Sequence, residues 1–181
     1  MAKDRPDRVK EGDFREWYFP VEEIVGWTKQ FLQDVGYEIL PETYIGFAKP
    51  DFHAKRVEGD KTYEIVGIGC QHFDVALEGL TKLAAIRSVR GDKIDYTIVV
   101  PPVNEFLMLE FFRTEKGWKY FEIKRNKFMV WFANPDEEYV WCLVGEPLDK
   151  TCKEYFALGK QSLDGVLAMQ LSKELWEEEE Y

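Results

Sequence analysis

Acidic and basic side chains that could do chemistry are concentrated in the stretch AKPDFHAKRVEGDKTYEIVGIG, residues 48–69. Asp51 follows a proline, His53 and Lys55 come soon after it, and Glu64 lies beyond a Gly-Asp pair. Carboxylate oxygens are the ligands that Mg²⁺ prefers, and a histidine can act near neutral pH as a base or a metal ligand. Metal-assisted or acid–base chemistry is therefore open to these residues if the fold brings them to one face.

The turn within this stretch decides which side chains share a face. A two-residue turn at Gly59-Asp60 would join two antiparallel strands, with His53 opposite Val66 and Lys55 opposite Glu64. Side chains alternate along a strand, so a change of one residue in the loop would move the carboxylates to opposite faces. In the expected register one face carries Asp51, His53, Lys55, Glu64 and Val66.

The surrounding pattern predicts the elements that position these residues. Apolar residues at intervals of three and four predict a helix over 21–35, which Gly36 would end. A short strand follows at YEIL, a second helix is expected from Asp74 to Val89, and IDYTIVVPP has the apolar run of a strand buried on both faces. These elements predict an α/β domain with one mixed sheet and helices on both faces.

The second half of the chain predicts more elements of the same kind. We expect a helix over 104–113, two or three strands within 117–144 with turns near 125–126 and 134–135, and helices from about Asp149 and about Ser162. The aromatic and basic residues of 111–132 could stack bases, but their alternation favours a half-buried strand pair whose aromatics fill the core. The predicted organisation is an N-terminal arm over 1–14, a core over 15–103 and an extension over 104–181 packed on the same domain.

The order of these elements, and the residues within them, resemble the PD-(D/E)XK nuclease superfamily. The likeness runs from about Val21 to Pro102, and rests on Pro50-Asp51 on the second strand, Glu64 on the third, the Leu/Ala-rich helix and the strand that ends in IVVPP. This superfamily has the restriction-endonuclease-like fold and includes Holliday-junction resolvases. The resemblance implies a restriction-endonuclease-like mixed sheet flanked by helices, here with a C-terminal extension of strands and two helices.

The resemblance also implies a metal site. Asp51 and Glu64 would hold Mg²⁺ or Mn²⁺, and Glu23 stands where many members have a further acidic residue. A bound metal ion lowers the pKa of a coordinated water and neutralises charge on the phosphate. The family's lysine, which orients or activates that water, falls at Val66 in this chain. Loss of such a group costs about 3–4 kcal/mol of transition-state stabilisation.

Three residues could replace the missing lysine. Lys82 lies on the following helix, where some members carry their lysine, and Lys55 and His53 share the face of Glu64 in the expected register. Each also has a structural interpretation: Lys82 as a solvated charge, Lys55 as a cross-strand partner of Glu64, and His53 as a hydrogen-bonded histidine. Asp51 could likewise be a strand-start residue, and the predicted metal ligand Glu23 a surface charge.

Composition and charge limit the partners. The chain has 181 residues, 45 % of them hydrophobic, and a net charge of −10, which speaks against a generally basic surface for nucleic acid. A local DNA-binding face is still open, and its predicted residues are Arg87, Arg90 and Lys93. Homodimerisation is implied by the resemblance alone.

Targeting features are not evident in the sequence. The first residues, MAKDRPDRVKEGDF, are charged and lack an apolar signal-peptide core, and no apolar run approaches the ~20 residues that span a bilayer. Cys70, Cys142 and Cys152 form no CxxC pair, which favours reduced thiols. We expect a cytoplasmic protein without membrane contact.

Three functions remain open at this point. The chain could be a degenerate or weakly active metal-dependent DNA endonuclease, or a non-catalytic nuclease-fold module that binds a partner. It could also be an α/β domain of unrelated function that mimics a short motif.

Overall fold

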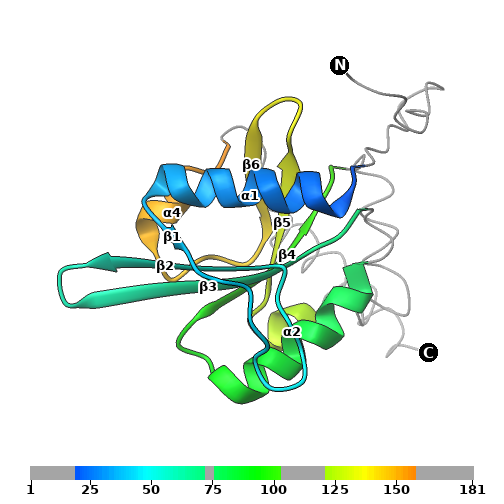
Figure 1. Ribbon diagram of the computed structural model, residues 1–181, viewed down its shortest axis with the longest axis vertical. Helices are drawn as coiled ribbons and strands as arrows, with labels where there is room; N and C mark the ends of the chain where they lie inside the picture. Colours follow the sequence, from blue (N-terminus) through cyan, green and yellow to red (C-terminus); the bar gives the residue numbers. More distant parts are fainter. Residues whose placement is uncertain (1–18, 72–75, 103–120, 158–181) are drawn as a thin grey trace, which may run out of the picture.

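A six-stranded mixed sheet with helices on both faces forms the protein (Figure 1). The computed structural model describes residues 19–71, 76–102 and 121–157. The strands lie in the order β1-β2-β3-β4-β5-β6, and the prediction of an α/β domain with one mixed sheet flanked by helices is confirmed. The elements are α1 (Val21–Val35), β1 (Glu38–Ile39), β2 (Phe52–Glu58), β3 (Lys61–Gly69), α2 (Ala76–Arg90), β4 (Asp95–Val100), β5 (Met129–Asn134), β6 (Tyr139–Val144) and α4 (Lys150–Glu154).

Strand direction changes across the sheet. β1, β2 and β3 are antiparallel, β3, β4 and β5 are parallel, and β6 returns antiparallel to β5. The predicted hairpin register is confirmed, because His53 pairs with Val66 and Lys55 pairs with Glu64. β5 and β6, which belong to the predicted extension, continue the same sheet.

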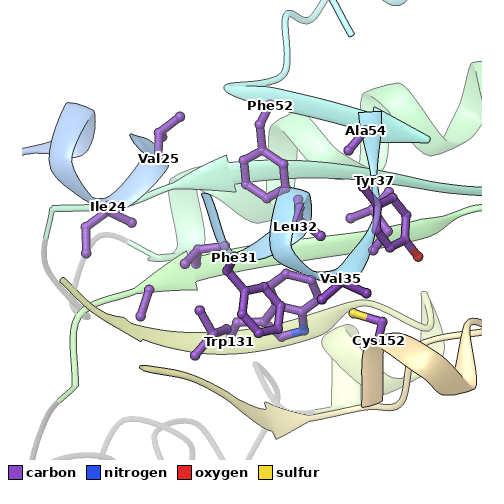
Figure 2. Close-up of a cluster of buried hydrophobic side chains, with 14 of the residues drawn as sticks. Ile24, Val25, Phe31, Leu32, Val35, Tyr37, Phe52, Ala54, Trp131 and Cys152 are labelled. Carbon is purple, nitrogen blue, oxygen red and sulfur yellow. The ribbon is translucent and has the colours of Figure 1, made fainter. Parts of the chain in front are cut away.

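The face under α1 is packed by large apolar side chains (Figure 2). Phe31 and Leu32 of α1 lie over Phe52 of β2 and Trp131 of β5. The rings of Phe31 and Trp131 are edge to face, with their centroids 6.0 Å apart. Fully burying one such side chain stabilises the fold by about 1.5–3 kcal/mol. α1 ends at Gly36, whose φ of 106° is left-handed. Glycine adopts this conformation readily because it has no side chain.

The face under α2 has a separate apolar core. Leu83 and Ile86 of α2 pack with Val66 and Ile68 of β3 and Ile98 of β4. β4 is buried along its whole length, as its apolar run predicts. The face of β2 and β3 that carries His53, Glu64 and Val66 is therefore directed toward α2.

The segment before β5 corrects one prediction. Residues 121–125 are helical and do not form a strand. Asn126 donates from its side chain to the Glu122 carbonyl at 2.8 Å, and Arg125 pairs with Glu122 one turn back. After the helix the chain turns at Lys127, whose φ is 57°, and β5 follows. The charged residues of this segment fit a solvated helix face as well as a strand face. The prediction of a strand here, which rested on their alternation with aromatic residues, is therefore wrong.

Several predictions fall on other parts of the chain. The N-terminal arm, the Asp74 helix cap, the helix over 104–113 and the helix from about Ser162 lie outside the described residues. The helix predicted near Asp149 is present as α4, with Asp149 as its N-cap. Within the described ranges, none of the helices has the length and apolar character needed to cross a membrane. The three cysteines, all within the described ranges, are thiols that form no disulfide.

Candidate functional site

Glu64 lies on the α2 side of β3 and has two cationic or polar neighbours. His53 Nε2 is 3.0 Å from Glu64 Oε2, and Arg90, from the last turn of α2, forms an ion pair with the same oxygen. Glu64 and His53 are both largely buried. The structure thus brings together Glu64, His53 and Arg90, while Lys55 stands directly opposite Glu64 in the strand ladder.

Asp51 occupies a different position, at the start of β2. Its Oδ2 atom accepts a hydrogen bond from the Gly69 backbone N–H at 2.8 Å. Burial raises the pKa of the Asp51 carboxyl, although this hydrogen bond and the positive charge of Lys82 act in the opposite direction. Lys82, one of the predicted replacements for the lysine, therefore acts electrostatically on Asp51.

Asp51 and Glu64 do not converge on one point. The ladder pairs Phe52 with Gly67 and Lys55 with Glu64, so His53 lies between the two acids along β2. With a rise of ~3.3 Å per residue, the backbone position opposite Asp51 is about 13 Å from Glu64. Oxygens that share one Mg²⁺ ion each lie only ~2.1 Å from it.

The two acids as placed do not fit a shared ion site. The Glu64 carboxylate is directed to His53 and Arg90, and the Asp51 carboxylate is directed to Gly69. Among the residues that the structure describes, there is no group of three or more His, Cys, Asp or Glu side chains that could hold a metal ion. We therefore assign no catalytic step to a metal held by these two acids.

Val66 and Ile68 fill the β3 face between Glu64 and Gly69. Val66 is fully buried and packs in the α2 core with Leu83 and Ile86. A lysine at position 66 would enter this core, where a charge without a partner is strongly disfavoured. The packing around position 66 therefore suits the valine and not the lysine that the resemblance to PD-(D/E)XK nucleases implies.

Glu23 lies at the same end of the sheet as Asp51. It is exposed in the first turn of α1, and that turn passes over Gly69, because a β-carbon at Gly69 would lie 2.7 Å from Val25 Cγ2. The residues predicted to bind nucleic acid lie at the C-terminal end of α2. Arg87 and Arg90 occupy its last turn, and Lys93 follows in the loop to β4.

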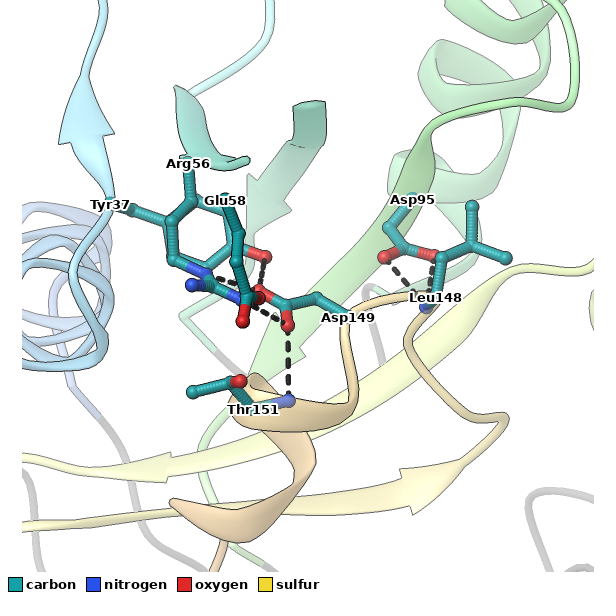
Figure 3. Close-up of polar contacts among 7 residues, drawn as sticks. All are labelled: Tyr37, Arg56, Glu58, Asp95, Leu148, Asp149 and Thr151. Carbon is teal, nitrogen blue, oxygen red and sulfur yellow. Dashed lines mark hydrogen bonds and ion pairs between the residues drawn. The ribbon is translucent and has the colours of Figure 1, made fainter. Parts of the chain in front are cut away.

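Sequence reasoning missed a buried polar cluster around Asp149, which is only 1 % exposed (Figure 3). Asp149 Oδ2 accepts from the Tyr37 hydroxyl at 2.8 Å and from Arg56 Nε at 2.7 Å, and Oδ1 accepts from Arg56 Nη2 at 2.7 Å and from the Thr151 N–H at 3.0 Å. Burial by itself raises the pKa of Asp149, but the hydrogen bonds from Arg56 and Tyr37 outweigh it and lower the pKa.

Asp95 lies beside this cluster at the start of β4. Both of its carboxylate oxygens accept from the Leu148 N–H, at 3.2 and 3.0 Å (Figure 3). Burial and the negative charge of Asp149 together raise the pKa of Asp95 to about 7, although the hydrogen bond from the Leu148 N–H acts in the opposite direction. The sequence carries one signal for this residue, since it is the acid that begins the otherwise uncharged and buried strand DYTIVV.

The Asp149 and Asp95 contacts join the chain before and within α4 to β2 and β4. Each carboxylate is aimed at a backbone N–H of the segment 148–151, and Asp149 is also neutralised by Arg56. These contacts satisfy buried groups that would otherwise be costly. We therefore assign this cluster to the stability of the fold rather than to chemistry.

Comparison with known proteins gives limited likeness. No protein-family model matches the chain, and no curated protein sequence matches it. Among solved structures, an XisH family protein from Nostoc punctiforme PCC 73102 is similar at a TM-score of 0.41 and 14 % identity, over 66 % of this chain and 96 % of that one. An FdxN element excision controlling factor protein from Anabaena variabilis is similar at a TM-score of 0.41 and 15 % identity, with the same coverage.

Proposed function

We propose that this protein is a non-catalytic module with a nuclease-like fold, which binds a partner and does not hydrolyse phosphodiester bonds. The observation that carries this proposal is the engagement of Glu64 by Arg90 and His53, away from Asp51. Metal-dependent hydrolysis needs ligands that hold the ion beside the attacked phosphate, and these two carboxylates are held apart.

DNA is the partner class that we propose for the module. Arg87, Arg90 and Lys93 place positive charge at the end of α2 in a chain whose net charge is −10. Lysine and arginine contacts to phosphates supply most of the affinity in such complexes, and they do not require a catalytic site.

A thermal melt with rising Mn²⁺ tests the proposal. An ion that binds only the folded chain raises its stability by ~2.7 kcal/mol at a hundred times the dissociation constant. We expect no increase in melting temperature for the wild type, and none for Asp51→Asn. We also expect no cleavage of single-stranded, duplex or branched DNA.

A matched pair of variants separates a structural Glu64 from a catalytic one. Glu64→Gln removes the charge that pairs with Arg90, so it should lower the melting temperature slightly and leave Mn²⁺ without effect. Glu137→Gln, at an exposed position in the β5–β6 turn, is the control. A Mn²⁺-dependent stabilisation of the wild type that Glu64→Gln and Asp51→Asn both abolish would refute the proposal.

One observation favours a second candidate, a weakly active metal-dependent DNA endonuclease. The charge of Lys82 acts on the Asp51 carboxyl, as a lysine relocated to the helix would. This candidate predicts DNA cleavage in Mn²⁺ that Lys82→Gln removes while the fold is retained.

A further inference from the structure

Phe47 is fully exposed, at 102 % of its reference area, on the connection between β1 and β2. Tyr44 on the same connection is 71 % exposed, and Val89 in the last turn of α2 is also exposed. The connection runs beside α2 (Figure 1), and a β-carbon at Gly46 would lie 2.8 Å from Val89 Cγ2. Three large apolar side chains from two elements thus meet solvent in one region.

The turn that carries Phe47 is well anchored. Ile45 N–H donates to the Ala48 carbonyl at 2.8 Å, Ala48 N–H donates to the Ile45 carbonyl at 3.4 Å, and Gly46 has the positive φ, 64°, that such two-residue turns use. Ile45 and Ala48 pack against the core under α2. The backbone is therefore held on both sides of Phe47, while the Phe47 ring itself buries no surface.

Several cations lie near this turn. Lys49 follows it directly, and Arg87, Arg90 and Lys93 lie at the end of α2 and in the next loop. The acids nearby are Glu42, which pairs with Lys29, Glu64, which pairs with Arg90, and Asp51 and Asp92. Lys49, Arg87 and Lys93 lie outside these two ion pairs and supply positive charge beside the turn.

We propose that the turn Ile45–Ala48 is a stacking site for a base of single-stranded nucleic acid, with Phe47 as the stacking ring and Lys49 and the end of α2 as phosphate contacts. This inference deepens the proposed function and rests on it. Aromatic rings stack on any base, and neighbouring cations follow the strand backbone.

The size of the apolar region favours bases over a protein partner. A stable protein interface covers about 800 Å² on each partner, whereas Phe47, Tyr44 and Val89 are single side chains set among charged residues. A stacked base needs only a surface of about one ring.

Fluorescence anisotropy with a labelled oligo-dT strand tests this site, in EDTA so that no cleavage occurs. The wild type should bind the single strand more tightly than a duplex of equal length. Phe47→Ala should weaken that binding by roughly tenfold or more and leave the melting temperature unchanged, because the ring buries no surface. Tyr155→Ala is the matched control, since Tyr155 is an exposed aromatic at the end of α4, which packs on the α1 side of the sheet.

A second variant tests the charge contribution. Lys49→Gln should weaken the binding of the single strand, because one cation fewer is present to neutralise its phosphates. The slope of log Kd against log salt should fall by about 0.7 for each phosphate that the variant no longer neutralises. Equal binding by wild type and Phe47→Ala would overturn the proposal, as would no binding of oligo-dT by the wild type at low salt.

A third result would assign the exposed side chains to protein contact instead. If the wild type self-associates in sedimentation, and Phe47→Ala becomes monomeric with no change in oligonucleotide binding, the stacking site is refuted. Failure of the proposed function has a different signature, which is cleavage or stabilisation in Mn²⁺.

Discussion

Asp95 should make the stability of this protein depend on pH, and Asp95→Asn should remove that dependence. Asp95 is only 7 % exposed, and burial raises its pKa from 3.8 to about 7 in the folded chain. Between these two pH values the folded state keeps a proton that the unfolded state releases. The contribution of Asp95 to the free energy of unfolding therefore falls as the pH rises from about 4 to about 7, and is level above that.

The size of this effect follows from the shift. Each pKa unit corresponds to about 1.4 kcal/mol, so a shift of this size corresponds to about 4 kcal/mol at most. Asparagine keeps an oxygen that can accept from the Leu148 N–H but never ionises. Any fixed cost of the amide is present at every pH, so it cancels when two pH values are compared.

Urea unfolding at pH 4 and at pH 8 measures the effect. We expect the stability of Asp95→Asn relative to wild type to improve by a few kcal/mol, and at most about 4 kcal/mol, between pH 4 and pH 8. Asp60→Asn, in the exposed β2–β3 turn, is the control, and its stability relative to wild type should change by only a few tenths of a kcal/mol between the two pH values. A relative stability of Asp95→Asn that stays constant between the two pH values would refute the reasoning.

Two further pairs of variants probe the packing of the sheet and the buried cluster around Asp149. A β-carbon at Gly67 would overlap the Phe52 ring, so Gly67→Ala should lower the free energy of unfolding by about 1–3 kcal/mol, and a second change, Phe52→Leu, should recover part of it; additive losses in urea unfolding would contradict this. Arg56→Met leaves Asp149 buried without its cation and should cost about 3–5 kcal/mol, whereas Lys153→Met, from an exposed ion pair, should cost about 0–1 kcal/mol. Similar losses for these last two variants would count against the buried cluster.

Local patterns in the sequence predict much of this fold. The apolar spacing and Gly36 predict α1 with its observed ends, and the Gly59-Asp60 turn predicts the register of β2 against β3. Asp149 is found at the start of α4 as expected. Each of these features depends on residues that are close in the chain, so the physical causes can be found in a short window.

The segment before β5 shows where a short window fails. Its alternating aromatic and charged residues fit a strand, and yet residues 121–125 are helical, with Ile123 buried in the core under α2. A helical period and a strand period are both compatible with so few residues, and the contacts that distinguish them form only in the folded chain.

Local features of the sequence are enough to predict which face of β2 and β3 carries Asp51, His53 and Glu64, because side-chain alternation and a two-residue turn are local properties. The contacts of those residues depend on how the elements pack in three dimensions. Arg90 reaches Glu64 from the end of α2, and Asp149 meets Tyr37 and Arg56 across more than ninety residues of sequence. Such partners are set by the order of strands and the docking of helices, and side-chain periodicity carries no information about either.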